Sequence, residues 1–126
     1  MSLLTKAKHL LTGEEAEQDA CVYLAKKGLK LITKNYRCRF GEIDIIMQDQ
    51  QSLVFVEVRY RKHSQYGSGA ESVTASKQKK LIRSAQWYLQ QHPKSNQYAC
   101  RFDVVSMSED IQGGSHIDWI KNAIQA

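Results

Sequence analysis

The sequence predicts one α/β domain over residues 1–126, in which a mixed sheet is flanked by helices in the order α-β-β-β-α-β. Two segments carry apolar residues at helical spacing, and the runs between and after them are rich in β-branched and aromatic residues. A chain of 126 residues with 42% hydrophobic content suits a single core. Helices before and after a series of strands favour a sheet with a helix packed on each side.

The first helix is expected over residues 13–27, followed by one irregular strand. Apolar residues recur there at helical spacing, and Gly28 provides a stop just beyond them. Residues 29–32 and 36–40 are then rich in branched and aromatic side chains, and Asn35 lies between them. We expect a turn or bulge at Asn35 within this strand.

Residues 42–47 and 53–60 predict a β-hairpin around the polar break at residues 49–52. Residues 61–76 contain Gly67 and Gly69 without a periodic apolar pattern, so a long mobile loop is expected. A second helix is predicted over residues 77–91, because apolar positions repeat at helical spacing and Pro93 follows. We expect a strand over 98–107, a turn over 108–115, and a short strand-to-helix tail over 116–124.

The charge balance makes an anionic partner plausible without requiring one. The chain carries 18 Lys and Arg against 13 Asp and Glu, a net charge of +5. An equally simple explanation is that this charge only keeps the protein soluble. The three cysteines form no Cys-x-x-Cys pair, and no apolar run has the length of a signal peptide or a membrane span. A cytoplasmic protein outside the membrane is therefore expected.

Two acids in the hairpin are the first candidate site. A symmetric turn about Gln50 and Gln51 places Asp44 directly opposite Glu57 on one face. Cross-strand Cβ atoms lie about 5 Å apart, so two like charges there would be destabilising without a cation. Arg59, two residues after Glu57, shares that face and could form a structural salt bridge. The alternative is a divalent cation such as Mg²⁺, which prefers carboxylate oxygens; the pattern leaves both open.

Four short motifs resemble a known family. Gly13-Glu14-Glu15-Ala16-Glu17, Asn35-Tyr36-Arg37, Gly41-Glu42-Ile43-Asp44 and Phe55-Val56-Glu57-Val58-Arg59 together resemble the YraN family of small bacterial proteins. That family is similar to archaeal Holliday-junction resolvases and to the restriction-endonuclease-like superfamily with its Asp…Glu-x-Lys signature. The resemblance implies a restriction-endonuclease-like core, and it covers nearly the whole chain.

The resemblance also implies roles for individual residues. Asp44 and Glu57 match the two metal-binding acids of the family. The backbone carbonyl of Val58 matches the third ligand, and Glu17 matches an additional acid from the first helix. The implied cofactor is Mg²⁺ or Mn²⁺, with Asp44, Glu57, Arg59 and Glu17 as the catalytic set. For Glu17 an ordinary solvated acid at a helix start is the alternative. Arg59 stands where the signature has lysine. A guanidinium stays protonated, so Arg59 can hold a phosphate oxygen but cannot accept a proton.

Basic residues around the hairpin and the second helix suggest a surface for nucleic acid. The start of that helix is rich in lysine, and a bound phosphate would offset the unfavourable helix dipole. A solvated charged face is the alternative. The residues expected to contact phosphates are Arg37, Arg39, Arg61, Lys62, Lys77, Lys79 and Lys80. Asp103 and His116 lie in later segments, where roles in packing or edge pairing are expected.

The leading functional hypothesis is a Mg²⁺-dependent endonuclease that hydrolyses phosphodiester bonds in branched or structured DNA. Two other classes stay open: a nucleic-acid-binding module of the same fold without turnover, and a structural adaptor whose acids and arginines form only ion pairs. Because the related resolvases act as two-fold dimers, a homodimer is a further expectation.

Overall fold

The computed structural model describes residues 13–61, 73–109 and 114–126. They form two α-helices, one short 3-10 helix and five strands. The elements are α2 (Gly13–Lys26), β1 (Lys30–Cys38), β2 (Gly41–Asp49), β3 (Ser52–Arg61), α3 (Ala75–Gln91), η2 (Pro93–Gln97), β4 (Ala99–Glu109) and β5 (Ser115–Ile124). No helix in these ranges is long and apolar enough to cross a membrane.

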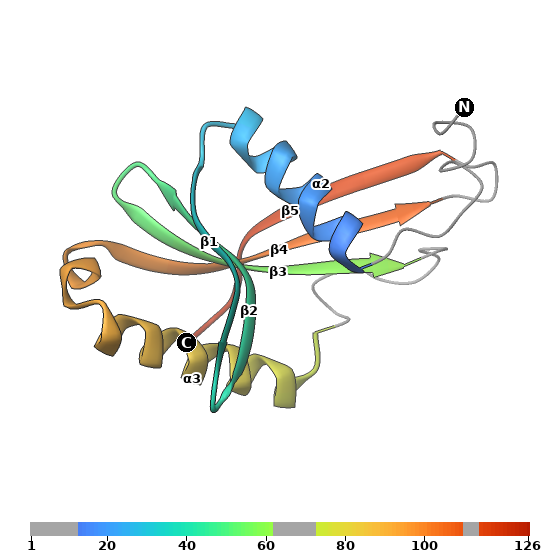
Figure 1. Cartoon of the computed structure of the whole chain (residues 1–126). Coiled ribbons are helices and arrows are strands. Elements are labelled where there is room, and N and C mark those ends of the chain that lie inside the picture. Colours follow the sequence, from blue (N-terminus) through green and yellow to red (C-terminus); the bar gives the residue numbers. More distant parts are fainter. Residues whose placement is uncertain (1–12, 62–72, 110–113) are drawn as a thin grey trace.

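The five strands form one mixed sheet in the order β1-β2-β3-β4-β5. Strands β3 and β4 are parallel, and the other three neighbouring pairs are antiparallel. The parallel pair requires the chain to cross over between its two strands, and α3 makes that connection. Helices α2 and α3 lie on opposite faces of the sheet (Figure 1). The predicted α-β-β-β-α-β order and the mixed sheet with a helix on each side are confirmed.

The core has two layers, one under each helix. Alternate strand residues point to opposite faces, which is why neighbouring residues of β3 divide between the layers. The layer under α2 includes Leu24, Ile45, Val54 and Val56, whereas the layer under α3 includes Ile46, Leu53, Phe55 and Tyr88. A sheet buried on both faces explains the nearly continuous apolar runs of β2 and β3.

Strand β1 is irregular, as the sequence predicts. Asn35 has a positive φ of 54°, a conformation that asparagine tolerates better than most residues. The pairing register of β1 with β2 also shifts between Leu31 and Thr33. Both irregularities increase the bend of the strand. The β1–β2 hairpin accordingly curves away from the other strands (Figure 1).

Helix α3 begins two residues earlier than predicted. Thr74 is its N-cap, and the Thr74 side chain accepts a hydrogen bond from the backbone N–H of Lys77. The loop predicted over residues 61–76 includes Thr74, and its residues 62–72 lie outside the described residues. At the other end, Pro93 opens η2, a short helix that the sequence pattern does not predict.

The expected strand-to-helix tail is wrong, because residues 115–124 form one strand, β5. Pairing with β4 satisfies the backbone of that strand, and Ile117 and Trp119 pack against the core layer under α2. Asn122, with φ 53°, lies where the register of the two strands shifts. The bulge breaks the alternation of apolar residues, which is why the pattern suggested a helix. In the predicted turn, residues 110–113 lie outside the described residues.

Candidate functional site

The candidate site lies at a fork between β2 and β3. Their pairing runs from Asp49↔Ser52 to Ile45↔Val56, in the register that the symmetric turn predicts. Beyond Ile45 the two strands separate: β2 continues beside β1, and β3 continues beside β4 (Figure 1). Asp44 and Glu57 are the first residues of the two branches, and both are buried, with exposed fractions of 8% and 2%.

Asp44 and Glu57 are not a regular cross-strand pair, which corrects the sequence prediction. The Oδ2 atom of Asp44 instead accepts a hydrogen bond of 2.9 Å from the backbone N–H of Val58. The carboxylate of Asp44 therefore reaches across the fork to a backbone group that ladder pairing with β2 leaves unused. This bond fixes the orientation of the Asp44 carboxylate beside Glu57.

Glu57 carries two opposing electrostatic influences. Burial is the main cause that raises the pKa of Glu57 to about 7, and the charge of Asp44 and a hydrogen bond with it add to the effect. The neighbouring Lys77 lowers this pKa. The Nζ atom of Lys77 lies 2.8 Å from Glu57 Oε2, and Nη1 of Arg59 lies 3.7 Å from the same oxygen. The cation that two adjacent acids require is thus provided mainly by Lys77, from a different element than the one predicted.

Glu17 joins this group from helix α2. Burial, the charge of Asp44 and a hydrogen bond with it, and the charge of Glu42 raise the pKa of Glu17 to about 7, whereas a hydrogen bond with Asn35 lowers it. Asp44 is therefore the common neighbour of Glu17 and Glu57. Asp44 of β2 thus neighbours one acid from α2 and one from β3, and a role of these acids in metal binding stays a prediction.

The donor set fits a partly hydrated metal ion and not an ion enclosed by protein. Among the residues that the structure describes, no group of three or more His, Cys, Asp or Glu side chains is arranged to hold a metal ion. Asp44 and Glu57 still offer two adjacent carboxylates, and Mg²⁺ is often bound by one or two carboxylates while it keeps several waters. The assignment of Glu17 and of the Val58 carbonyl as further ligands stays a prediction.

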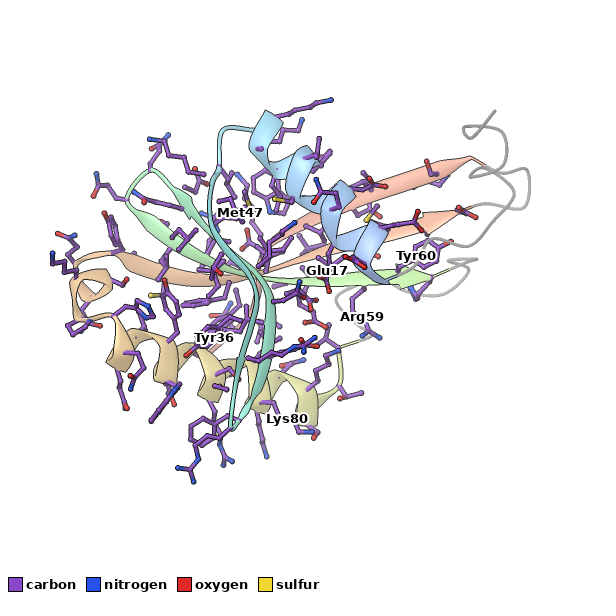
Figure 2. The ribbon with its side chains drawn as sticks, viewed as in Figure 1. Glu17, Tyr36, Met47, Arg59, Tyr60 and Lys80 are labelled. Atoms are coloured by element: carbon purple, nitrogen blue, oxygen red, sulfur yellow. The ribbon has the colours of Figure 1, made fainter. Side chains whose placement is uncertain are left out.

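The acids open into a cavity of about 350 Å³ between the fork and the start of α3. It is lined by Asp44, Glu57, Lys77 and Lys80, among others. A neighbouring hollow of about 560 Å³ contains Glu17, Asn35 and Arg37, and Glu42 lines both. Figure 2 labels Glu17, Arg59 and Lys80 on the three elements α2, β3 and α3 that border the fork. Acidic and basic side chains therefore line two neighbouring hollows that share Glu42.

The predicted phosphate-binding residues are dispersed around this region. Arg37 forms an exposed ion pair of 3.2 Å with Glu42, and Arg39 lies over the ring of Phe40 in the turn between β1 and β2. Lys79 is exposed on α3 but does not line the cavity, Arg61 is half-buried at the end of β3, and Lys62 lies outside the described residues. Their role in binding stays a prediction.

Sequence reasoning missed three contributors to the site. The sequence predicts a turn or bulge at Asn35 and a loop at Thr74, and it includes Asn35 and Glu42 in motifs without giving either a role in the site. Asn35 and Glu42 lie in the family motifs, which was a signal for them, but only the fold brings Asn35 to Glu17, Glu42 to the cavity and Thr74 to Lys77.

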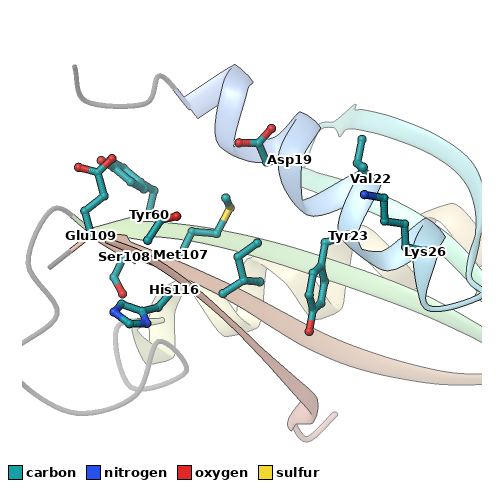
Figure 3. Close-up of a pocket in the computed structure, with 11 residues that line it drawn as sticks. Asp19, Val22, Tyr23, Lys26, Tyr60, Met107, Ser108, Glu109 and His116 are labelled. Atoms are coloured by element: carbon teal, nitrogen blue, oxygen red, sulfur yellow. The ribbon is translucent and has the colours of Figure 1, made fainter. Parts of the chain in front are cut away.

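A second cavity, of about 320 Å³, lies against α2 and the ends of β3 and β4 (Figure 3). Its walls combine Asp19, Lys26, Glu109 and His116 with apolar side chains. None of the site residues predicted from the sequence lines it. His116 is at the start of β5 and pairs with Ser108, in agreement with the expected edge-pairing role.

Comparisons with known proteins identify related chains. A family model described as "Uncharacterised protein family UPF0102" matches residues 16–107. A UPF0102 protein of Nitrosococcus oceani is 47% identical over 119 residues, which cover 94% of this chain and 95% of the relative. A UPF0102 protein of Coxiella burnetii is 50% identical over 113 residues, covering 90% and 91%.

One solved structure is also similar, at a low level. It is described as "The structure of Pyrococcus Furiosus SfsA in complex with Ca2+" and is 11% identical, with a TM-score of 0.39 over 90% of this chain and 62% of that chain. A likeness of this size carries no argument about function.

Proposed function

The chain belongs to the uncharacterised protein family UPF0102, as its motifs indicate, and from this membership and the acidic fork we propose that it is a metal-dependent endonuclease. Its substrate would be branched or structured DNA, and its reaction the hydrolysis of a phosphodiester bond. One observation carries the proposal: two buried carboxylates, Asp44 and Glu57, are held side by side at a cavity that lysines also line.

Such an arrangement is unfavourable for folding alone. Burial and the charge of Asp44 raise the pKa values of Glu57 and Glu17 to about 7, so ionising all of these acids together is costly in the free protein. Groups with strongly perturbed pKa values that lie in a cavity are typical of functional sites. The excess of acid is what a divalent cation would compensate.

Each group would have a separate task. Asp44 and Glu57 would hold Mg²⁺ or Mn²⁺, with the Val58 carbonyl and Glu17 as the predicted further ligands. When bound, such an ion supplies a Lewis acid for a phosphoryl oxygen and lowers the pKa of a bound water. The Val58 N–H orients Asp44, and Arg59 is close enough to Glu57 to stabilise charge that develops on the phosphoryl group.

The basic residues would bind the DNA backbone around this site. Lys80 lines the cavity, and Arg37 lies in the adjoining hollow. Arg39, Arg61, Lys62, Lys77 and Lys79 complete the predicted set. Contacts to phosphates provide affinity without sequence information, so recognition of backbone shape is expected.

A second candidate function is binding without turnover. It is favoured by Arg59, because arginine stands where the nuclease signature has lysine and cannot exchange a proton at neutral pH. Such a module would bind DNA with a steep salt dependence and without any effect of a chelator. A structural adaptor, the third candidate, would show neither metal binding nor DNA affinity beyond that expected from its charge.

The test is cleavage of a four-way DNA junction and of a matched linear duplex with Mg²⁺ or Mn²⁺. We expect the wild-type protein to nick the junction, and Asp44→Asn and Glu57→Gln each to reduce the rate by at least about 10²-fold. Asp118→Asn, at an exposed position of β5, is the matched control and should keep the wild-type rate. Cleavage that survives both site substitutions would identify a contaminating nuclease.

Two further parts of the proposal concern assembly and location. A homodimer would present two sites to a two-fold junction, and sedimentation of the protein with and without junction DNA would detect it. We also propose a cytoplasmic location, which the free thiols of Cys21, Cys38 and Cys100 support.

A further inference from the structure

We propose that Lys77, in the first turn of α3, takes the part that the Asp…Glu-x-Lys signature gives to the residue at position 59. Its ammonium would hold Glu57 in place and donate a hydrogen bond to the phosphoryl oxygen of the DNA at the same time. This inference rests on the proposed nuclease function and changes the role of Lys77 from a general phosphate contact to a positioning residue of the site.

The contacts of Glu57 distinguish Lys77 from Arg59. Both cations approach the same oxygen of Glu57, but Nζ of Lys77 is 2.8 Å away, within hydrogen-bond range, and Nη1 of Arg59 is 3.7 Å away. The side chain of Lys77 is 46% exposed, whereas that of Glu57 is 3% exposed. The ammonium thus reaches a buried carboxylate from the cavity side and can contact both the protein and a ligand in the cavity.

The backbone of Lys77 is held in place independently of this ion pair. Its N–H donates to Oγ1 of Thr74 at 3.2 Å, and the side chain of Gln78 donates to the carbonyl of Val73 at 2.9 Å. Val73 is buried in the core layer under α3. The first turn of α3 is therefore anchored to the sheet. Because the backbone of Lys77 is already fixed near Glu57, little conformational entropy is lost when its side chain binds there.

Lys80 shows what an ordinary phosphate contact would look like. It lines the same cavity, one turn further along α3. Within the ranges that the structure describes, the acids of the fork form ion pairs with Lys77 and Arg59 and none with Lys80. The positive charge of Lys80 is therefore available to DNA, whereas that of Lys77 is already partly neutralised by Glu57.

An ammonium and a guanidinium are not equivalent at such a position. Lysine presents three rotatable donors from one compact charge, so one N–H can bind Glu57 while another binds the substrate. The guanidinium of Arg59 is planar and larger. Lys77 of α3 would thus provide the ammonium group that the signature places at position 59 and that this sequence lacks there.

The first experiment compares cleavage rates at saturating DNA and metal. We expect Lys77→Met to reduce the rate by about 10²-fold or more, and Lys77→Arg, which keeps the charge, to stay within about tenfold of wild type. Adding Arg59→Lys to Lys77→Met should recover about tenfold, because it restores an ammonium beside Glu57. Arg83→Met, at an exposed position of α3 away from the cavity, is the control for general effects on the helix.

The second experiment measures DNA affinity against salt concentration in the presence of a chelator, so it needs no turnover. Lys80→Met should reduce the slope of log affinity against log salt by about one. Lys77→Met should reduce that slope by clearly less than Lys80→Met does, because the charge of Lys77 is partly neutralised by Glu57. An equal reduction in both variants would make Lys77 an ordinary phosphate contact and overturn the inference.

The two proposals fail in distinguishable ways. An active wild type with an equally active Lys77→Met overturns only the role of Lys77, as does a rate lost in Lys77→Met that Arg59→Lys does not recover. A wild-type protein that cleaves no DNA with any divalent cation overturns the proposed function together with this inference. Thermal midpoints of all variants, compared with wild type, exclude unfolding as the cause of lost cleavage.

Discussion

Asp103 of β4 and Glu57 of β3 are buried acids on adjacent strands, but their surroundings differ. Asp103 is fully buried and accepts hydrogen bonds from Nε of Arg101, Nε1 of Trp119 and the N–H of Asn122. Arg101 also binds Asp49, and these hydrogen bonds raise the pKa of Arg101 against the opposing effect of burial. Both oxygens of Asp103 therefore accept hydrogen bonds, and Asp49 accepts one from the same arginine.

Glu57 lies in the opposite situation, on the face of the sheet that α3 covers. Its nearest acidic neighbour, Asp44, raises its pKa, and the cations beside it are partly exposed. Asp103 is thus held by a saturated set of donors, whereas Glu57 belongs to an excess of acid in an open cavity. The difference separates a structural ion pair from the proposed cation site, and the following predictions test that separation.

The largest effect is expected from Asp103→Asn. It leaves the partly buried Arg101 with Asp49 as its remaining acid, and it places an amide where three donors converge. Breaking a buried ion pair on one side typically lowers stability by several kcal/mol, so the free energy of unfolding should fall by about 3 kcal/mol. Urea denaturation measures it, and a variant as stable as Asp118→Asn would show that the network contributes little.

A smaller effect of opposite sign is expected at the fork. Because the pKa of Glu57 is about 7 in the folded protein and about 4.5 unfolded, its contribution to stability is full below pH 4.5 and is lost as the pH rises through about 7. In Glu57→Gln this part of the pH dependence should disappear. Between pH 5 and pH 8 the free energy of unfolding of the variant should therefore rise, relative to that of wild type, by on the order of 2 kcal/mol. Urea denaturation at both pH values, in metal-free buffer, gives the comparison.

The same experiment has a clear contrary result. If wild type and Glu57→Gln lose stability equally between the two pH values, Glu57 does not carry the excess charge. Asp118→Asn again serves as the control, because its exposed carboxylate should not alter the pH dependence.

The smallest effect concerns the support of the fork by α3. Gly41 has φ 146°, and a Cβ there would lie 3.4 Å from Oγ of Ser84. Gly41→Ala should lower stability by about 1 kcal/mol through strain and crowding.

Oγ of Ser84 is buried without a hydrogen-bond partner in the described residues, so Ser84→Ala should be neutral or stabilising. Thermal denaturation of both variants checks this; a destabilised Ser84→Ala would reveal a contact of the hydroxyl.

Much of the fold could be predicted from local patterns. The hairpin register followed from a symmetric turn, and the two helices followed from the spacing of residues such as Ala20 and Leu81. The helical reading of the tail was wrong because a bulge at Asn122 disturbs the alternation of β5. Local periodicity cannot anticipate a bulge that pairing with another strand makes favourable.

The site was predictable in its acids but not in its geometry. Asp44 and Glu57 were found from the hairpin and the family motifs. The point at which β2 leaves β3 depends on the bend at Asn35 and the long-range pairing of β3 with β4, which no local pattern encodes. The sequence predicts Lys77 only as a phosphate contact, because its contact with Glu57 joins residues on different elements.

The most direct test of the account is a calorimetric titration of the DNA-free protein with Mn²⁺ at pH 8. If the fork is a cation site, wild type and Asp118→Asn should each bind about one ion per chain, and Asp44→Asn and Glu57→Gln should show no site-stoichiometric heat. Heat that persists unchanged in Asp44→Asn and Glu57→Gln, or its absence from wild type, would contradict the assignment of the acidic fork as a metal site.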